Sequence, residues 1–254
     1  MELKGEGRTA LMPFLTAGHP SLHVTEATIG GLESAGAHIV ELGIPFSDPI
    51  ADGPVIAAAM HNALVDGLQV DDVIEMVDRI RKTTSLGLVA MVSSSIVERR
   101  GAESFLHQLK DAGFDGIIVP DIDTDRADAL LPMIDELDLA FALLVAPTTT
   151  DQRLDTLLPR CRGFVYLLAR AGLTGEQSDA PDIAAAVERI RARCDLPIAV
   201  GFGISTAEHV AAVTAHADAA IVGSAIVRRM DAADDPAAAA CDYVATLATG
   251  LTTR

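Results

Sequence analysis

The chain has 254 residues, of which 50% are hydrophobic, so it carries enough apolar material for a large core and is not an intrinsically disordered protein. Its 36 acidic and 19 basic residues give a net charge of −17, whose field repels nucleic acid and anionic membrane surfaces and excludes both as partners. The first ten residues carry charges at Glu2, Lys4, Glu6 and Arg8 in place of the apolar run of a signal peptide or spanning helix, so we expect a cytoplasmic protein.

Short apolar runs bounded by Gly, Pro or Asp recur along the whole chain and predict about eight β-strands. The runs are continuously apolar, which is typical of parallel strands covered by helices on both faces. In chain order they comprise residues 11–15, 38–42, 87–92, 116–121, 141–146, 163–169, 197–203 and 219–224.

Stretches with helical periodicity lie between these runs. The interval between the second and third strands is longer than the others and predicts an additional helix over residues 54–65, followed by a helix over 71–82. One apolar stripe at helical spacing consists of Ile183, Val187, Ile190 and Cys194. We therefore expect Cys194 to lie on the buried face of a helix.

The cysteines and histidines show no metal-ligand spacing. Cys161, Cys194 and Cys241 are widely separated and form no C-x-x-C motif, which predicts structural thiols and argues against a disulfide framework or a zinc site. The histidines in helical stretches are interpreted as surface or packing residues: His61, His107, His209 and His216.

Strands and helices alternate about every 25 to 30 residues without a linker, which indicates parallel β/α units in one domain over residues 1–254. About eight such units close most economically into a (β/α)8 barrel, a TIM barrel; an open doubly wound sheet is the alternative. In such a barrel, catalytic groups lie at the carboxyl ends of the strands. The polar residues and turns at those ends are Glu41, Asp121, Tyr166, Gly201–Gly203 and Gly223–Ser224.

The last two strands end in VGFGIST and IVGSAIV, each followed by a predicted helix start. The Gly201–Gly203 turn lets the backbone approach a ligand, Ser205 or Thr206 can cap the next helix, and Gly223–Ser224 opens a short final helix. Two helix N-termini would then direct unpaired N–H groups at one spot, which suits a phosphate dianion. The alternative is that these glycines serve only turns and packing.

A strand-end glutamate and two loop aspartates stand close together in ELGIPFSDPIADGP, residues 41–54. Glu41 is expected to face a low-dielectric barrel mouth, which would raise its pKa toward the range useful for proton transfer. Asp52, on a loop that also carries Asp48 and is stiffened by Pro49 and Pro54, could reach the same cavity and complete an acid/base pair. The alternative is that Glu41 bonds to its barrel neighbours and the aspartates cap turns.

The stretch ELGIPFSDPIADGP resembles the signature of the tryptophan synthase α family. The motifs LMPFLTAGHP, LLVAPTTT, FVYLLARAGLTG, VGFGIST and IVGSAIV are similar to the same family in the same order, so the resemblance covers nearly the whole chain. It implies a TIM barrel that cleaves indole-3-glycerol phosphate into indole and glyceraldehyde 3-phosphate, with no metal and no organic cofactor.

The resemblance also implies roles for individual residues. Glu41 stands where the family has its catalytic glutamate, and Asp52 where it has its catalytic aspartate. Tyr166 matches a tyrosine that lines the active site. The loop expected to close over substrate contains Arg170, Thr174 and Gly175, and the residues matched to phosphate binding are Gly201, Phe202, Gly203, Gly223 and Ser224.

The chain departs from the family pattern on loops at the barrel mouth. Residues 92–95 replace the usual Tyr-x-Asn-Pro, residues 121–123 replace Asp-Leu-Pro, and His19 replaces an aspartate. In the family this rim docks on a β subunit. Our main hypothesis is an α subunit that binds a β subunit. Two alternatives stay open: a stand-alone lyase that releases indole, and a mainly non-catalytic interaction subunit. Another phosphate-sugar barrel enzyme would leave residues 41–54 unexplained.

Overall fold

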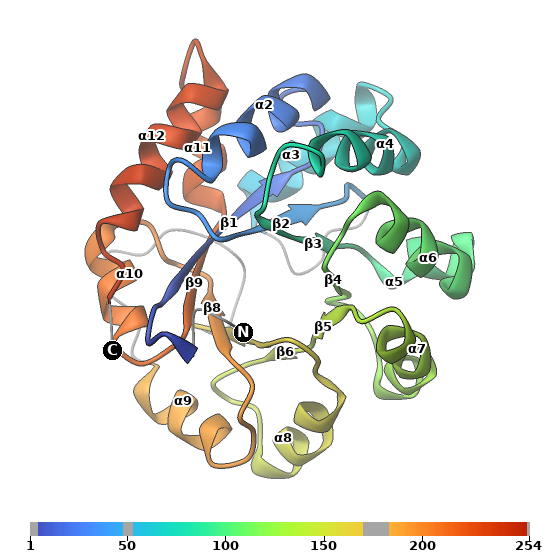
Figure 1. Cartoon of the computed structure of the whole chain (residues 1–254), viewed down its shortest axis with the longest axis vertical. Coiled ribbons are helices and arrows are strands. Elements are labelled where there is room, and N and C mark those ends of the chain that lie inside the picture. Colours follow the sequence, from blue (N-terminus) through green and yellow to red (C-terminus); the bar gives the residue numbers. More distant parts are fainter. Residues whose placement is uncertain (1–4, 48–52, 170–182, 253–254) are drawn as a thin grey trace.

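The computed structural model describes residues 5–47, 53–169 and 183–252, which form a parallel sheet surrounded by helices (Figure 1). The strand order is β5-β4-β3-β2-β1-β9-β8-β7-β6. The two edge strands, β5 and β6, follow each other directly in the chain, and both derive from the predicted apolar run over residues 141–146. This closes the sheet into a TIM barrel. The strands are β1 (Ala10–Thr16), β2 (Ile39–Gly43), β3 (Gly87–Met91), β4 (Gly116–Ile118), β5 (Ala140–Ala142), β6 (Leu144–Val145), β7 (Val165–Leu168), β8 (Ile198–Gly201) and β9 (Ala219–Val222).

Helices cover the outside of the sheet. Two of them, over residues 54–65 and 70–80, fill the long interval after β2, and pairs also follow β3 and β9. The prediction that the helix beginning at Ser224 is the final one was wrong, because a further helix over residues 236–248 follows it. The helices are α2 (Leu22–Leu32), α3 (Pro54–Val65), α4 (Val70–Ile80), α5 (Ser94–Arg100), α6 (Ala102–Ala112), α7 (Thr124–Glu136), α8 (Asp151–Leu157), η1 (Leu158–Arg160), α9 (Ala184–Arg191), α10 (Ala207–Thr214), α11 (Ser224–Asp231) and α12 (Pro236–Ala248).

Local sequence signals explain where several helices begin and end. The Ser21 hydroxyl accepts a hydrogen bond from the Val24 N–H and caps α2, and the Asp123 carboxylate caps α7 in the same way. Pro54 occupies the first turn of α3, where its missing N–H costs nothing. Gly113 ends α6 in the left-handed conformation, with φ of 100°.

Both faces of the strands are buried, which is why the runs are continuously apolar. Side chains such as Leu11, Leu42 and Val200 point outward into the layer between sheet and helices. The alternate residues point inward and form a second cluster inside the barrel: Ala10, Met12, Val89, Ile118, Ala142, Phe164, Tyr166, Ala199, Ala219 and Ile221. Burying one large apolar side chain contributes about 1.5 to 3 kcal/mol, so these two layers dominate the stability of the barrel.

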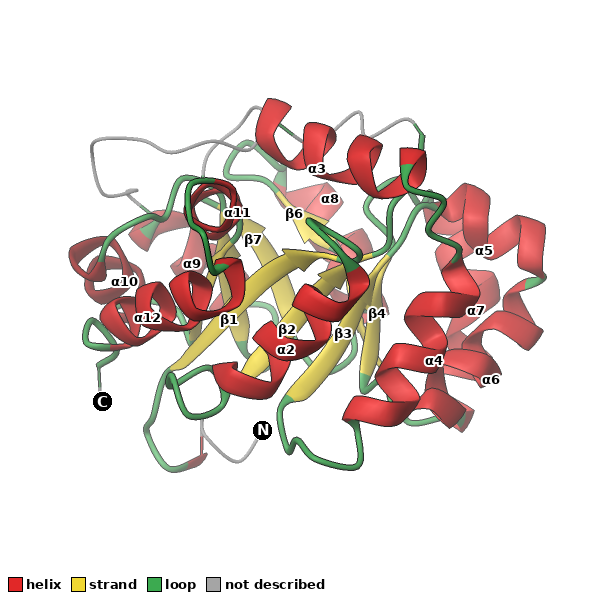
Figure 2. Ribbon diagram, turned by 90° about the horizontal axis from the view of Figure 1, so that it is seen from above, coloured by secondary structure: helices red, strands yellow, loops and turns green. Residues whose placement is uncertain are grey.

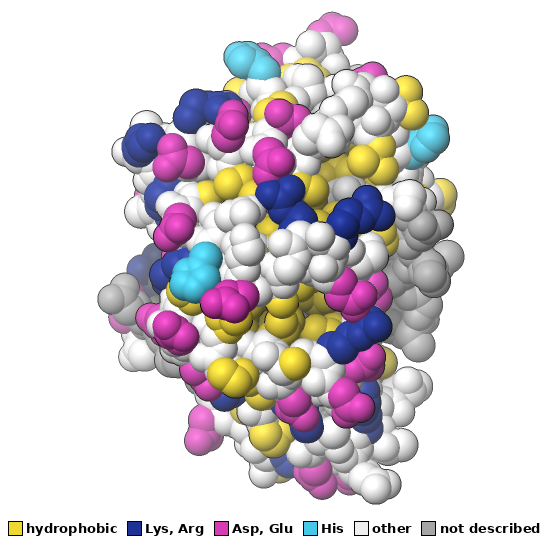
Figure 3. Space-filling view, turned by 90° about the vertical axis from the view of Figure 1, so that its right-hand side faces the viewer, with side chains coloured by type: hydrophobic (Ala, Val, Ile, Leu, Met, Phe, Trp, Pro, Cys, Tyr) yellow, Lys and Arg dark blue, Asp and Glu magenta, His cyan; other side chains and the backbone are white. Residues whose placement is uncertain are grey.

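Ion pairs connect neighbouring units on the outside. Arg162 donates to both carboxylate oxygens of Asp135, and this hydrogen bonding lowers the pKa of Asp135. Arg160 holds Asp128 in the same manner. The face built from the helices on the right of Figure 1 accordingly shows basic and acidic side chains next to each other (Figure 3). Such exposed pairs each add little to the stability of the fold.

The cysteines are free thiols. Cys161 is buried, and burial raises its pKa to about 11, so it stays protonated and unreactive near neutral pH. The expectation that Cys194 lies on a buried helical stripe was wrong. The helix carrying buried Val187 and Ile190 ends at Arg191, so Cys194 falls in the following turn and is only partly buried.

Candidate active site

The carboxyl ends of the strands meet at one end of the barrel, where α3 lies across the strands (Figure 2). Of the predicted site residues, Gly201 ends β8 and Gly223 directly follows β9, whereas Glu41 and Tyr166 lie within β2 and β7. This end of the barrel is called the mouth below. Among the described residues, no group of three or more His, Cys, Asp or Glu side chains is placed to hold a metal ion. No helix in those residues is long and apolar enough to cross a membrane.

Glu41 lies on the inner face of β2 and has no exposed surface. In the strand register it is opposite Phe14 of β1 on one side and Val89 of β3 on the other. Glu41 thus lies between an aromatic and an aliphatic residue of the neighbouring strands, shielded from bulk water.

Phe14 is a functional candidate that the sequence analysis missed. A Cβ added at Gly43 would lie 2.5 Å from Phe14 Cζ, and one added at Gly223 would lie 3.3 Å from Phe14 Cβ. The two glycines thus leave room for the aromatic ring between β2 and the start of α11. Phe14 also packs with Met60 of α3 and Val227 of α11. The period-2 alternation of Ala10, Met12 and Phe14 was the signal that could have placed the ring inside the barrel.

Thr16 continues the same inner face of β1 and is a second missed candidate. It is 2% exposed, and its Oγ1 has no hydrogen-bond partner within the described parts of the chain. A buried hydroxyl without a partner costs free energy unless a ligand or water supplies one. Its position opposite Gly43 places this hydroxyl at the carboxyl ends of the strands, where a substrate could bind it.

Tyr166, Gly201 and Phe202 lie together on the opposite side of the mouth from the β2–β3 pair. The Tyr166 and Phe202 rings meet edge to face, with centroids 6.5 Å apart and an interplanar angle of 81°. A Cβ added at Gly201 would lie 2.5 Å from the Tyr166 hydroxyl oxygen, so the absence of a side chain there makes room for Tyr166. Phe202 and Gly203 both have φ of +81°, a conformation that is unusual for a phenylalanine and clusters at functional sites.

The turn after β8 is supported from behind by two helices. The Ser205 N–H donates to His209 Nδ1 at 3.4 Å, and the Tyr243 hydroxyl donates to the Ser205 carbonyl oxygen. Thr206, one of the two predicted caps, accepts a hydrogen bond from the His209 N–H and begins α10. These contacts hold the backbone of residues 202–206 in one position at the mouth.

Gly223 and Ser224 form the N-terminus of α11, as predicted. Gly223 is the N-cap residue and no side chain caps the helix there. The Gly223 carbonyl accepts from the N–H groups of Ile226 and Val227, which leaves the first N–H groups, on Ser224 and Ala225, without an acceptor inside the helix. A helix start of this kind binds anions through its N–H groups and its dipole.

Asp121, another strand-end candidate, is engaged at the rim. Its Oδ1 accepts from the Ser94 N–H at 2.8 Å, and its Oδ2 accepts from the hydroxyls of Ser93 and Ser94 at 2.9 Å each. His19 Nε2 lies 2.6 Å from Asp231 Oδ1 and links the loop after β1 to the end of α11. The rim segments that depart from the family pattern therefore have a network of their own.

The predicted residues Asp52, Arg170, Thr174 and Gly175 lie outside the described residues, as does Asp48. The structure brings Glu41 near Phe14, Phe14 near Gly223, and Tyr166 near Gly201 and Phe202. The convergence of Glu41 and Asp52 over one cavity stays a prediction.

Comparisons with known proteins identify the family of the chain. The family model described as tryptophan synthase alpha chain matches residues 1–252. A tryptophan synthase alpha chain from Synechococcus sp. (strain CC9902) is 43% identical over 91% of this chain and 87% of its own length, and one from Cyanothece sp. (strain PCC 7425 / ATCC 29141) is 39% identical over 98% and 95%.

Solved structures give the same result. A structure of Mycobacterium tuberculosis tryptophan synthase superimposes with a TM-score of 0.90, at 33% identity over 98% of this chain and 95% of that chain. A tryptophan synthase complex from Pyrococcus furiosus gives a TM-score of 0.86 at 32% identity, over 94% and 98% of the two chains. With its TIM-barrel fold and a matching sequence over nearly its full length, the chain belongs to the tryptophan synthase alpha chain family.

Proposed function

We propose that this chain is a carbon–carbon lyase of tryptophan biosynthesis that cleaves indole-3-glycerol phosphate to indole and glyceraldehyde 3-phosphate, with Glu41 as its central acid and base. The family membership supports the reaction. The observation that supports the role of Glu41 is its complete burial on the inner face of β2, opposite Phe14 and Val89. A carboxyl group that is shielded from water and placed at a barrel mouth is suited to proton transfer.

Two proton transfers are needed in the proposed reaction. Indole is a poor leaving group until C3 is protonated, so Glu41 delivers its proton to C3 and forms an indolenine. Its carboxylate then accepts the proton of the adjacent glycerol hydroxyl while the carbon–carbon bond breaks. The electrons of that bond return to the ring, and the hydroxyl carbon becomes the aldehyde of glyceraldehyde 3-phosphate. A well-placed group in each role accelerates the reaction about 10² to 10⁴-fold.

Asp52 has the second role in the proposal. As the ring is protonated, positive charge develops at the indole nitrogen, and a carboxylate that accepts a hydrogen bond from the N–H stabilises that charge. Arg170, Thr174 and Gly175 belong to the segment that closes over the substrate, and Thr174 bonds to Asp52 when it does. Closure of this kind excludes water from the reacting atoms.

The phosphate is bound by backbone N–H groups. The start of α11 at Gly223–Ser224 and the turn Gly201–Phe202–Gly203 supply backbone donors, so the site favours an anion locally within a chain of net charge −17. The aromatic rings of Tyr166 and Phe14 line the mouth on its two sides. We assign the indole ring to the space beside Phe14 and Glu41. The buried Thr16 hydroxyl, which has no partner among the described residues, is our candidate for a hydrogen bond to the glycerol chain.

The mouth rim is proposed to dock on a tryptophan synthase β subunit. The similar structures include a tryptophan synthase complex, which supports a partner subunit. A stand-alone lyase is the second candidate, because the rim here has its own network between Asp121, Ser93 and Ser94.

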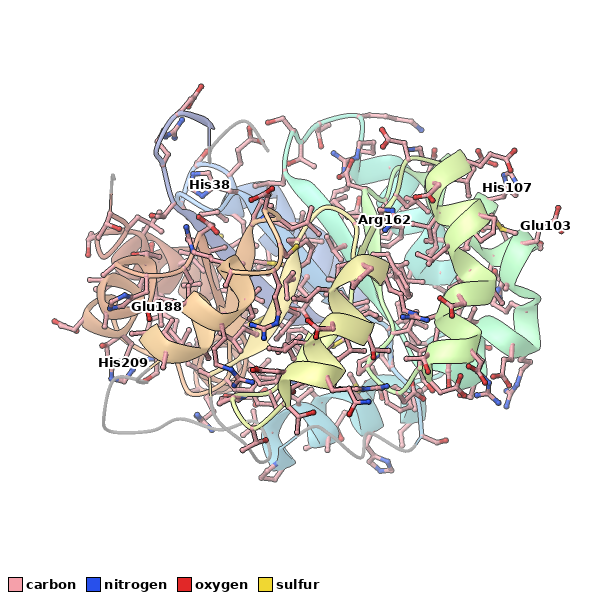
Figure 4. All side chains as sticks on the ribbon, turned by 90° about the horizontal axis from the view of Figure 1, so that it is seen from below. His38, Glu103, His107, Arg162, Glu188 and His209 are labelled. Carbon is pink, nitrogen blue, oxygen red and sulfur yellow. The ribbon has the colours of Figure 1, made fainter. Side chains whose placement is uncertain are left out.

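Replacement of Glu41 by Gln is expected to lower kcat for indole release by at least about 10³-fold, because the amide can neither deliver nor accept the proton. Indole formation from indole-3-glycerol phosphate by the purified chain measures this, and circular dichroism checks that the barrel still folds. The control is Glu188→Gln, an exposed position on α9 that is visible on the outer side of the barrel (Figure 4) and should leave kcat unchanged. A Glu41→Gln variant with near-normal turnover would show that the role is misassigned.

Replacement of Ser224 by Asp separates phosphate binding from stability. A carboxylate at the first position of α11 repels the phosphate, so KM should rise at least about tenfold, while its interaction with the helix dipole leaves the free energy of unfolding unchanged or higher by about 0.3 to 1 kcal/mol. Steady-state kinetics and urea unfolding measure the two effects. Ser224→Asn is the uncharged control. An unchanged KM in Ser224→Asp would place the phosphate elsewhere.

Replacement of Gly201 by Ala should displace Tyr166, since the new Cβ would lie 2.5 Å from its hydroxyl oxygen. We expect a loss of about 1 to 3 kcal/mol in unfolding free energy together with a lower kcat/KM. The Tyr166→Phe variant lacks the hydroxyl oxygen that lies closest to the added Cβ. In that variant, Gly201→Ala should therefore lower the unfolding free energy by less. Gly30→Ala is the control, because nothing lies within 4 Å of its added Cβ. Additive effects of the two substitutions would contradict the contact.

Mixing the chain with a tryptophan synthase β subunit should give a stable complex in size-exclusion chromatography and a higher rate of indole formation. Ser95→Arg, at the exposed start of α5 on the rim, should weaken the complex at least tenfold because it introduces a bulky charge into the interface. His107→Arg, which adds the same group on the exposed side of α6, is the control (Figure 4). No complex, with full activity of the chain alone, would favour the stand-alone lyase.

A further inference from the structure

A second cavity lies at the end of the barrel opposite the mouth. It has a volume of about 260 Å³ and is bounded by the residues at which the strands begin. His38 and Arg162, which precede β2 and β7, lie toward this same end (Figure 4). The first inward-facing residues of most strands are small and so leave the space unfilled: Ala10, Gly87, Ala140, Ala199 and Ala219.

The cavity is separate from the catalytic mouth. Its inner wall includes Met12 and Val89, and Val89 lies directly opposite Glu41 in the strand register. The next inward-facing residues along neighbouring strands, Ile118 and Ile221, are buried and complete a layer across the barrel. Glu41 itself does not line the cavity, so a ligand bound there contacts Val89 and not the carboxyl group proposed to act in the cleavage.

The charged groups around the opening are neutralised by this chain itself. Arg8 pairs with Glu6 at 3.2 Å. Asp115 accepts from Arg81 and from the Leu88 N–H, both at 2.8 Å. Asp218 likewise accepts hydrogen bonds from Arg191 at 3.2 Å and from the Ile198 N–H at 2.9 Å. A charged ligand would gain no new counter-charge here, whereas the apolar interior offers contacts to an uncharged one.

From this geometry we propose that the amino-terminal end of the barrel holds a second binding site, for a compact, uncharged apolar molecule of one or two rings. Apolar cavities of about 150 Å³ in other proteins stay dry and take up benzene, so about 260 Å³ accommodates a ring of that class. The ring of strand ends excludes a helix or strand of another protein as the occupant. Binding is favoured by burial of the ligand's apolar surface and by its dispersion contacts with Met12, Val89 and Phe164.

Benzene is the probe, and the reporters are the methionine methyl groups of the chain labelled with ¹³C. Met12 lines the cavity, while Met60 belongs to the cluster at the mouth with Phe14. We expect saturable shifts and nuclear Overhauser effects between benzene and the Met12 methyl, with a Kd of about 1 mM or lower. The readout does not depend on the lyase reaction, so it is independent of the proposed function.

Two variants fill the cavity from different strands, so that one can fail to fold without ending the test. Ala219→Leu and Ala199→Val should each weaken benzene binding at Met12 at least tenfold, and Ala129→Leu, on the exposed side of α7, should not. Absence of a saturable Met12 response in the wild-type chain would overturn the proposal. So would an equal response in a folded, cavity-filled variant, or a response confined to Met60.

Discussion

The burial of one carboxyl group inside the barrel is the constraint around which the mouth is built. Glu41 is fully buried on the inner face of β2, and removing a carboxyl group from water costs several kcal/mol of free energy if it is charged. The barrel supports it by closing the sheet around it, with β1 and β3 on either side and α3 near the mouth.

Glycines at the mouth are explained by the aromatic rings beside them. Gly43 and Gly223 leave space for Phe14, and Gly201 leaves space for Tyr166. The consequence is that two aromatic side chains line the mouth while backbone N–H groups at α11 stay accessible. The two ends of the barrel thus differ in kind, because the mouth combines a buried acid with helix N-termini, whereas the opposite end presents small apolar residues and charges that are already paired.

Much of the fold could be predicted from the sequence because parallel strands buried on both faces leave a strong signal. Each of the predicted apolar runs contains a strand, and α3 has the bounds expected from its Pro54 start. The interruption of the fifth run at Leu143 was not predictable, since it depends on pairing partners on two sides. The prediction that Cys194 lies on a buried helical stripe was wrong for a local reason, because α9 ends at Arg191.

The site was predictable only in part. The sequence singles out Glu41, Tyr166 and the two glycine turns because polar or glycine residues stand out in an apolar background, and their roles in the site stay predictions. Phe14 and Thr16 escaped because nothing in their types distinguishes them from core residues; only the register with Glu41 and Gly43 reveals them. Asp121 looked like a catalytic candidate, yet its carboxylate is occupied by the start of α5.

The central claim is that the indole ring lies against Glu41 while the phosphate is held by the backbone at the start of α11. A crystal structure of the Glu41→Gln variant with indole-3-glycerol phosphate bound tests it most directly. The account predicts phosphate oxygens within hydrogen-bonding distance of the Ser224 N–H and indole C3 next to the side chain at position 41. A phosphate bound elsewhere, or an indole ring remote from position 41, would contradict it.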